Sequence, residues 1–357
     1  MSQDGGKLLG EGVYGCAFDP PLKCERVKQG IIKDKNNHRV GKVTSVAAAQ
    51  KEFTMTQALS KHSNAEKYFV LIDSLCTPEP RAKQTDPELK SCEFTSGQSM
   101  PNMAQVTMPF AGKPLRVVPK TVKHLDFFAL GQHLLEAGTL MLLSNVVHRD
   151  IHPMNILVDD KQPARLLDFG VAWSPDALTL SNLPSLFMKF EPRFLQEPPE
   201  VSVVNGYNQK VPNHLIISRI ADEKLVLKLK ERVFSIPVRQ QMEVLKKFLL
   251  ASQSIQSRNA FGFFKLYWSK MDAWAIGANL LTVYTDLLFD PNFEASAAYK
   301  KRNQTARKVM LGLLAMDPAY RLDCVEALAL WAPESPLLKE KAVKDWLAAV
   351  TAMRKQL

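Results

Sequence analysis

The sequence of 357 residues lacks an uninterrupted apolar run of the roughly 18 residues that a membrane-spanning helix needs. The nearest approach, residues 125–147, is broken by Asp126 and Glu136, which predicts a half-buried helix. The first residues contain no basic-plus-apolar leader, and Ser2 stands where N-myristoylation requires glycine. We therefore expect a soluble, intracellular protein with no membrane partner.

Cysteine is scarce and scattered. The five cysteines are Cys16, Cys24, Cys76, Cys92 and Cys324. Their number is odd and no C-x-x-C pair occurs, which argues against both a disulfide framework and a zinc site. We expect five small, buried hydrophobic side chains in a protein of a reducing compartment. Apolar content of 46% and charged content of 23% are those of an ordinary globular protein, and the length suffices for two packed lobes.

Two short polar motifs follow one another in the middle of the chain. H-R-D occupies 148–150, with Asn155 five positions after the aspartate, and D-F-G occupies 168–170. The surrounding stretches VVHRDIHPMNILV (146–158) and ARLLDFGVA (164–172) resemble the catalytic loop and the metal-binding loop of protein kinases. The resemblance implies phosphoryl transfer from ATP, a reaction in which positioning and neutralisation of phosphate charge dominate.

The resemblance also implies roles for individual residues. Asp150 is the expected base, and Asn155 and Asp168 are the expected ligands of Mg²⁺, with Mn²⁺ as the alternative ion. His152 stands where serine/threonine kinases have a lysine that contacts the γ-phosphate. An unperturbed imidazole is fully charged only below a pKa of about 6.5, so we expect weaker phosphate stabilisation at neutral pH.

The first 20 residues contain a G-x-G-x-x-G pattern formed by Gly10, Gly12 and Gly15. A dinucleotide-binding turn would continue into a helix, but Pro20 and Pro21 follow. The pattern therefore predicts a strand–turn–strand flap whose backbone amides approach phosphate oxygens. An ordinary glycine-rich hairpin is the alternative.

A β-rich run at 38–46 carries Lys42, and a helix is predicted over 47–62. By the resemblance, Lys42 binds the α- and β-phosphates and pairs with a glutamate on the helix. Glu52 is the expected partner, and Glu66 is the second choice.

Four apolar residues are expected around the adenine. By the resemblance, Ala17 and Val40 cover the base. Kinases usually have valine at the first of these positions and alanine at the second, so this chain has a volume-conserving swap. Met108 is expected at the inner wall and the Ala111 amide at the adenine edge. The sequence further predicts a strand over 68–75.

Three later matches extend the resemblance to about residue 330. Pro198, Pro199 and Glu200 resemble the A-P-E motif that ends a kinase activation segment, the stretch that begins at Asp168. MDAWAIGANLL (271–281) resembles the buried helix whose Asp272 holds the catalytic-loop backbone. Arg321 is the expected buried partner of Glu200, since a buried charge needs a mate.

Phosphorylation of the activation segment is one expected form of regulation, with Arg149 as the phosphate's docking point. The candidate hydroxyls are Ser174, Thr179, Ser181 and Ser185. An ordinary role as loop hydroxyls is the alternative for all four.

Residues 201–271 fall outside the resemblance. They hold twelve Lys/Arg against four Asp/Glu, a net charge of +8 within a chain of +10. Their pattern predicts two amphipathic helices, 215–233 and 238–255, separated at Pro237. The charge predicts a docking arm for an acidic protein or a nucleic acid, and a solvated helical elaboration is the alternative.

Together these observations predict an α+β, bilobal protein-kinase fold. We expect a β-rich N-lobe over 1–108, a hinge over 109–115, and a helical C-lobe over 116–357 that includes the basic insertion 201–271. The expected activity is transfer of the ATP γ-phosphate to Ser/Thr hydroxyls of proteins. A kinase-like scaffold with weak catalysis and a small-molecule phosphotransferase are the alternatives. Three short stretches (GEGVYGCAFDPPLKC, KYFVLIDSLC and PPE) resemble kinases of large nucleocytoplasmic DNA viruses, which would place the protein in host cytoplasm or virion.

Overall fold

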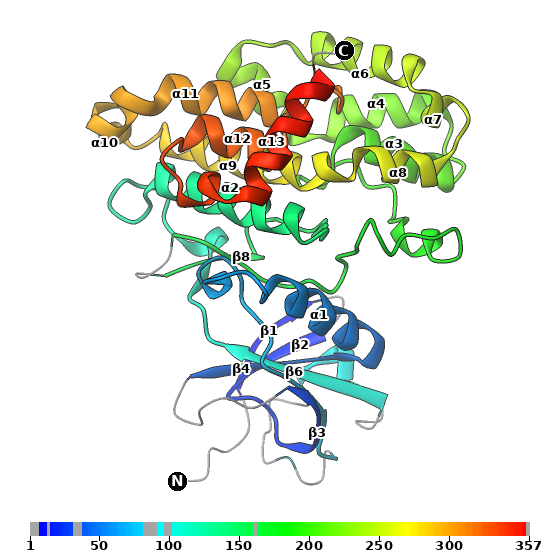
Figure 1. Ribbon diagram of the computed structural model, residues 1–357, viewed down its shortest axis with the longest axis vertical. Helices are drawn as coiled ribbons and strands as arrows, with labels where there is room; N and C mark the ends of the chain where they lie inside the picture. Colours follow the sequence, from blue (N-terminus) through cyan, green and yellow to red (C-terminus); the bar gives the residue numbers. More distant parts are fainter. Residues whose placement is uncertain are drawn as a thin grey trace. The chain divides into compact units, whose positions relative to one another are not determined.

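The computed structural model describes residues 7–12, 15–30, 38–80, 84, 91–95, 102–159 and 163–354. The chain folds as two units. Unit 1 comprises the described residues up to Gly112 together with Arg165–Ala172, and unit 2 comprises the described residues of 113–164 and those from Trp173 onward. Unit 1 is rich in β-structure and unit 2 is mainly helical, so the chain has a mixed α+β fold (Figure 1).

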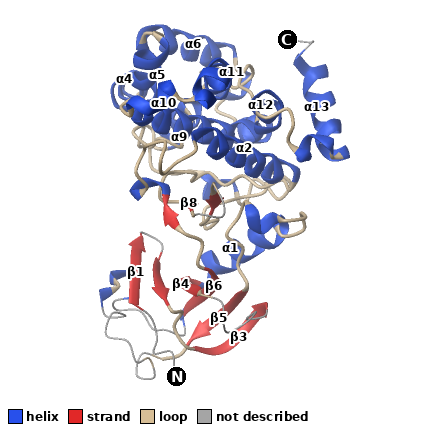
Figure 2. Cartoon of the chain, turned by 90° about the vertical axis from the view of Figure 1, so that its left-hand side faces the viewer, coloured by secondary structure: helices blue, strands red, loops and turns tan. Residues whose placement is uncertain are grey.

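Among the described residues of unit 1, six antiparallel strands form one sheet in the order β1-β2-β4-β6-β5-β3 (Figure 2). The strands are β1 (Lys7–Gly12), β2 (Gly15–Asp19), β3 (Cys24–Gly30), β4 (Arg39–Ser45), β5 (Ser74–Pro78) and β6 (Met103–Pro109). Helix α1 (Val46–Leu59) packs on β4, β5 and β6. It begins one residue before the predicted range of 47–62 and ends three residues earlier, and the Ser45 side chain caps its start by accepting a hydrogen bond from the Ala48 amide at 3.2 Å.

The strand expected over 68–75 is displaced, because β5 begins only at Ser74. The preceding residues form backbone hydrogen bonds with another segment of unit 1. The Val70 amide donates to the Leu166 carbonyl, and the Leu166 amide donates to the Tyr68 carbonyl, both at 2.9 Å. Apolar alternation along a chain does not reveal which neighbour will satisfy its backbone groups.

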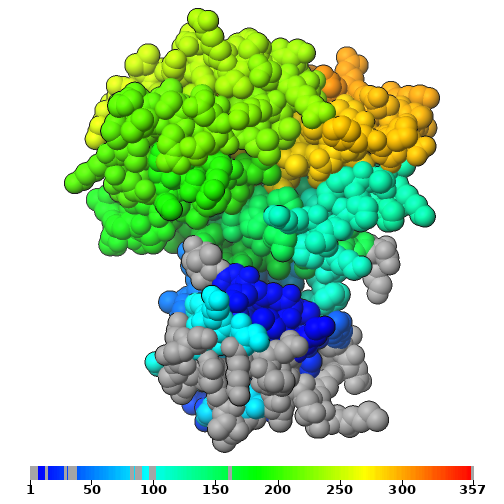
Figure 3. All heavy atoms as spheres, turned by 180° about the vertical axis from the view of Figure 1, so that it is seen from behind, coloured from blue at the N-terminus to red at the C-terminus, as the bar shows by residue number. Residues whose placement is uncertain are grey.

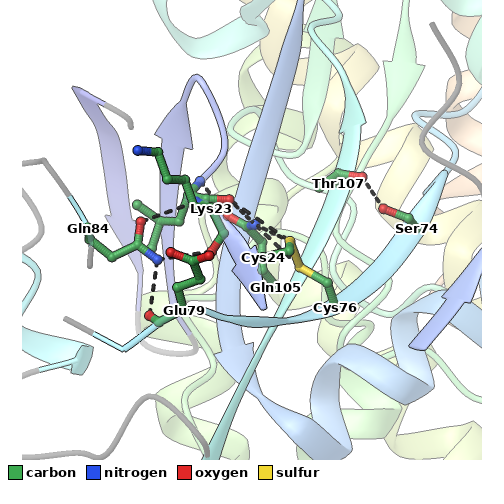
Figure 4. The surroundings of a disulfide bond; sticks show 9 residues. Lys23, Cys24, Ser74, Cys76, Glu79, Gln84, Gln105 and Thr107 are labelled. Atoms are coloured by element: carbon green, nitrogen blue, oxygen red, sulfur yellow. Dashed lines mark hydrogen bonds between the residues drawn. A yellow bond between two sulfur atoms is a disulfide. The ribbon is translucent and has the colours of Figure 1, made fainter. Parts of the chain in front are cut away.

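The expectation of five unpaired cysteines is wrong. Disulfides join Cys16 to Cys92 and Cys24 to Cys76, both within unit 1, and Cys324 is the buried free cysteine of the described chain. The second disulfide links β3 to β5, which are neighbours in the sheet (Figure 4). Spacing along the sequence could not show this pairing, because it follows from the strand order.

Unit 2 is built around helix α9 (Met271–Leu287), which is buried along almost its whole length. Helices α2 (Phe127–Leu143), α5 (Leu225–Phe234) and α11 (Ala297–Leu313) pack against it. Helix α2 begins at Phe127 because the Asp126 side chain accepts hydrogen bonds from the Phe128 and Ala129 amides. The other strands and α-helices of unit 2 are β7 (Lys113–Pro114), β8 (Ile156–Val158), α3 (Pro199–Asn208), α4 (Asn213–Glu223), α6 (Val238–Ala251), α7 (Gln253–Gln256), α8 (Ala260–Tyr267), α10 (Pro291–Ala295), α12 (Cys324–Trp331) and α13 (Lys341–Arg354). The short strand β9 (Arg165–Leu166) belongs to unit 1.

The basic insertion is helical, but the prediction of a single helix over 215–233 is wrong. This stretch forms two helices, α4 and α5, separated at Lys224, whose ψ of 101° is not helical. The buried Lys224 ammonium donates to the carbonyls of Phe194 and Glu197 at 3.2 and 2.8 Å. These tertiary contacts override helical periodicity. In Figure 3 the insertion, coloured green to yellow, covers a broad continuous surface of unit 2.

None of the described helices combines the length and the apolar character that crossing a membrane requires.

Candidate functional site

One charged cluster of unit 1 brings together three residues that the sequence singles out. The Lys42 ammonium lies 3.1 Å from Glu52 Oε2 and 2.5 Å from Asp168 Oδ1. Lys42 comes from β4, Glu52 from the buried face of α1, and Asp168 from the segment that returns to unit 1. Glu66, the second-choice partner, lies in a separate 3₁₀ turn and is exposed.

The cluster keeps the largely buried Lys42 side chain positively charged. Burial lowers the pKa of Lys42, but the carboxylates of Glu52 and Asp168 outweigh it, so that the pKa stands above its ordinary value. The Glu52 side chain is only 3% exposed, whereas that of Asp168 is 31% exposed. Asp168 also adopts a left-handed backbone conformation with φ of 67°, a strained state that is typical of functional sites. Asp168 therefore offers a carboxylate that solvent, and a metal ion, can reach.

The three glycines of the N-terminal pattern differ in what surrounds them. Among the described residues, a Cβ on Gly10 would meet nothing within 4 Å, and one on Gly12 only the Gly15 carbonyl oxygen at 3.9 Å. Gly15 has φ of +153°, and a Cβ there would lie 2.1 Å from the Val43 carbonyl oxygen. The chain's own packing therefore requires glycine at 15 but not at 10 or 12. Open space above the other two glycines is what the approach of a phosphate needs.

This contrast gives a matched pair of substitutions. We expect Gly15→Ala to destabilise the protein by about 1–3 kcal/mol, because of backbone strain and the clash. Gly12→Ala is expected to leave the melting temperature unchanged and to weaken ATP binding. Thermal melts and nucleotide titrations of both variants test this. Equal melting temperatures for the two variants would contradict the steric argument.

The apolar residues expected around the adenine lie on three neighbouring strands or just after them. Ala17 of β2 is directly opposite Lys42 in the sheet, and Val40 of β4 is directly opposite Met108 of β6. Met108 and Ala111 are both buried. The sheet register thus brings these residues to the neighbourhood of the Lys42 cluster. Their contact with a base stays a prediction.

In unit 2, Asp150 and Asn155 form a second polar group. The Asn155 side-chain amide donates to the Asp150 backbone carbonyl at 3.0 Å and to Asp150 Oδ2 at 3.2 Å. His152 Nε2 lies 3.5 Å from the same Oδ2. Gln196 Nε2 donates to Asp150 Oδ1 at 2.7 Å, a contact that no sequence pattern indicated. Both carboxylate oxygens of Asp150 are therefore held in place, while its side chain remains 24% exposed.

The environment of Asp150 favours the carboxylate form. Burial acts to raise its pKa, but the hydrogen bond and charge of His152, followed by the charge of His148, prevail and lower it. Asp150 is therefore ionised at neutral pH and able to accept a proton. His152 contributes to this as a neighbour of the carboxylate, a role that its place in the sequence alone did not reveal.

The backbone around Asp150 is fixed from helix α9. Asp272 accepts hydrogen bonds from the amides of His148 at 2.7 Å and Arg149 at 2.9 Å, as the sequence predicted. The Asn279 side chain donates to the Ile151 carbonyl at 2.8 Å. Arg149 has φ of 69°, and the bond from Asp272 helps to hold this conformation.

Comparison with known proteins gives one local similarity. No family model matches the chain. A stretch of 37 residues, 10% of the chain, is 54% identical to the phosphorylase b kinase gamma catalytic chain, liver/testis isoform, of Rattus norvegicus. The human and mouse proteins of the same description match with the same identity over the same length. The stretch covers 9% of each relative's length, so the chain spans less than a tenth of the curated relatives it matches. The similarity points to a kinase-like protein.

A buried ion pair joins α3 to the segment that follows α11. Arg321 Nη1 and Nη2 donate to Glu200 Oε1 and Oε2 at 2.7 and 3.0 Å, and both side chains are essentially inaccessible. This is the pairing expected from the sequence. It ties the end of the activation segment to the core of unit 2.

The insertion presents less charge at the surface than its composition suggests. Lys224 and Lys230 are buried, and Lys270 pairs with Asp323 and Glu326 of α12 and its cap. Arg219 pairs with Glu223. A docking role for the insertion rests on its exposed cations and stays a prediction.

Lys230 predicts a pH-dependent stability of unit 2. Burial, and then the Arg321 guanidinium, lower its pKa to about 7, and its ammonium donates to the Leu314 carbonyl at 2.7 Å. An unfolded lysine has a pKa of about 10.4. Between these two values the folded state binds fewer protons, so the free energy of unfolding rises with pH, by up to about 1.4 kcal/mol per pH unit.

We therefore expect Lys230→Met to remove this rise between about pH 7.5 and 9.5, a range that lies between the folded and unfolded pKa values of Lys230. Lys228→Met, at an exposed position of the same helix, is the control and keeps it. All five tryptophans belong to unit 2, so urea titrations followed by tryptophan fluorescence report on this unit. Identical slopes for the two variants would refute the role of Lys230.

One apparent metal cluster is not a candidate site. Glu11, Cys16 and Cys92 lie close together, but both sulfur atoms belong to a disulfide and cannot act as thiolate ligands. Asp168 and Asn155 offer oxygen atoms, the donors that Mg²⁺ prefers.

Proposed function

We propose that the chain is a protein kinase that transfers the γ-phosphate of ATP to Ser/Thr hydroxyls of protein substrates. The observation that carries this proposal is the Lys42–Glu52–Asp168 cluster of unit 1. A buried glutamate that fixes a lysine beside an accessible aspartate is the arrangement by which kinases bind phosphates and a metal ion. The local similarity to a kinase catalytic chain supports the same reading.

Each group has a part in the proposed reaction. Lys42 neutralises the phosphate oxygens, and Glu52 orients it. Asp168 and Asn155 would hold Mg²⁺, which, when bound, neutralises charge on the phosphates. Asp150 accepts the proton of the attacking hydroxyl, and Gln196 and Asn155 fix the orientation of its carboxylate. The bilobal kinase fold expected from the sequence is part of the proposal, with unit 1 as N-lobe and unit 2 as C-lobe.

Two alternatives make different predictions. A kinase-like scaffold is suggested by His152, but the retained Lys42, Asp150 and Asp168 disfavour it. A small-molecule phosphotransferase shares the order of Asp150 and Asn155. The Glu200–Arg321 pair and the contact of Asp272 with the catalytic loop favour a protein kinase. The proposal includes a relationship to kinases of large nucleocytoplasmic DNA viruses, which is based on the three short stretches of sequence.

Phosphoamino-acid analysis tests the proposal. The full chain is incubated with γ-labelled ATP, Mg²⁺ and generic acidic and basic proteins, and in parallel with small hydroxyl compounds. We expect label on phosphoserine or phosphothreonine. Label only on the small compounds would support the phosphotransferase, and nucleotide binding without transfer would support the scaffold.

A further inference from the structure

Helix α8 of the insertion contacts the part of the activation segment that belongs to unit 2, residues 173–200. Phe264 is fully buried and meets Trp173 edge to face, with ring centroids 5.9 Å apart. It also meets Phe187, at 6.4 Å. The next residue, Lys265, donates from its ammonium to the Pro175 carbonyl at 2.5 Å. One short helix therefore holds the segment near both ends of its first half.

The same helix reaches Arg149, the residue expected to receive a phosphate. The Arg149 guanidinium lies over the Phe264 ring, 6.0 Å from its centroid. Arg149 Nη2 donates to the Leu186 carbonyl at 2.7 Å, and the side chain is buried. The Arg149 side chain thus binds a backbone carbonyl of the activation segment, and Phe264 of α8 packs against the Arg149 guanidinium.

Three of the four candidate hydroxyls, those of Thr179, Ser181 and Ser185, make local contacts. Thr179 and Ser181 hydroxyls are 2.9 Å apart, and Ser185 donates to the Asn182 carbonyl at 2.7 Å. The Thr179 amide donates to the Asn182 side chain at 2.8 Å. These residues form a turn around Asn182 that is held by its own hydrogen bonds.

We propose that α8 holds the activation segment in place of a phosphate. Phe264 and Lys265 are then positioning residues of the proposed kinase, on whose activity this inference rests, and α8 is a brace within the chain. Phosphate transfer to protein substrates proceeds without phosphorylation of the activation segment. The residues that α8 contacts belong to unit 2, whereas Lys42 and Glu52 belong to unit 1, so we expect the brace to affect binding of a protein substrate more than binding of ATP.

Three variants on one helix test the brace. Lys265→Met removes the donor to Pro175 and keeps an exposed, helix-compatible side chain, so it is expected to fold. Lys265→Arg retains a donor. Leu266→Ala, at a neighbouring side chain that is 64% exposed, is the control. The readouts are hydrogen exchange of residues 173–187 and the KM values for protein substrate and for ATP.

We expect Lys265→Met to speed exchange of 173–187 and to raise the KM for protein substrate, each by about tenfold, with the KM for ATP unchanged. Lys265→Arg restores both values, and Leu266→Ala changes neither. Unchanged exchange in Lys265→Met would overturn the proposal.

A fourth variant addresses the phosphate directly. With Ser174, Thr179, Ser181 and Ser185 all replaced by alanine, we expect at least half of the wild-type rate. Loss of activity in this variant, with the Lys265 variants unaffected and with phosphate found by mass spectrometry on one of the four hydroxyls of the wild type, would show that a phosphate holds the segment. Failure of the wild type to transfer phosphate would refute the proposed function, whereas the exchange measurement decides on the brace independently of activity.

Discussion

We expect Asp150→Asn to lower kcat for phosphoryl transfer by about 10²–10⁴-fold, the contribution of a positioned general base. Asparagine keeps the shape of the side chain and an oxygen that can accept the hydrogen bond from Gln196. It cannot take up the proton of the acceptor hydroxyl. Since Asp150 is ionised at neutral pH, the substitution removes a base that is in its active form.

The KM for ATP separates this effect from damage to the site. Because Asp150 acts on the acceptor hydroxyl in the proposed reaction, we expect the KM for ATP to change little in Asp150→Asn. Asp222→Asn, on the exposed face of α4, is the matched control and should retain wild-type kinetics. Steady-state rates at saturating ATP provide the measurement, and an unchanged kcat for Asp150→Asn would exclude this residue as the base.

The second large effect concerns stability. We expect Arg321→Met to destabilise unit 2 by about 3–5 kcal/mol, because it leaves the Glu200 carboxylate buried without its mate. Arg321 also donates to the Ala315 carbonyl at 2.9–3.0 Å, which adds to the loss. Urea titrations monitored by tryptophan fluorescence measure the change in unit 2.

A double-mutant cycle isolates the ion pair itself. Arg321→Met combined with Glu200→Gln is expected to cost about 1–3 kcal/mol less than the sum of the two single substitutions. The exposed pair Glu243–Lys246 is the control, with side chains 53% and 47% accessible, and its removal is expected to cost less than about 1 kcal/mol. Additive losses at Arg321 and Glu200 would mean that the two charges do not depend on each other.

Pairings of buried charges were the part of the site that the sequence predicted best. Lys42 with Glu52, Glu200 with Arg321, and Asp272 with the backbone of the H-R-D loop all occur. The first and the third contact followed from the resemblance to protein kinases, whereas Glu200 and Arg321 also have a physical reason to pair, because a buried charge needs a partner.

Features that depend on the three-dimensional neighbourhood were not predictable. The disulfide of Cys24 and Cys76 follows from the adjacency of β3 and β5, which the chain order conceals. The break at Lys224 arises because its ammonium binds two carbonyls before α3. Gln196 lies two residues before the Pro198–Glu200 motif, but that motif does not indicate a contact with Asp150, and only the fold brings the Gln196 amide to this carboxylate. Composition also overstated the surface charge of the insertion, because it counts buried lysines with exposed ones.

The most direct measurement of the central claim is transfer of label from γ-labelled ATP to a protein hydroxyl, with wild type and Asp168→Ala assayed side by side in Mg²⁺. Asp168 is chosen because it joins the Lys42 cluster and offers an accessible carboxylate. We predict transfer by the wild type and its loss in the variant, with both proteins folded at the assay temperature. Equal transfer by both proteins, or none by the wild type, would contradict the account.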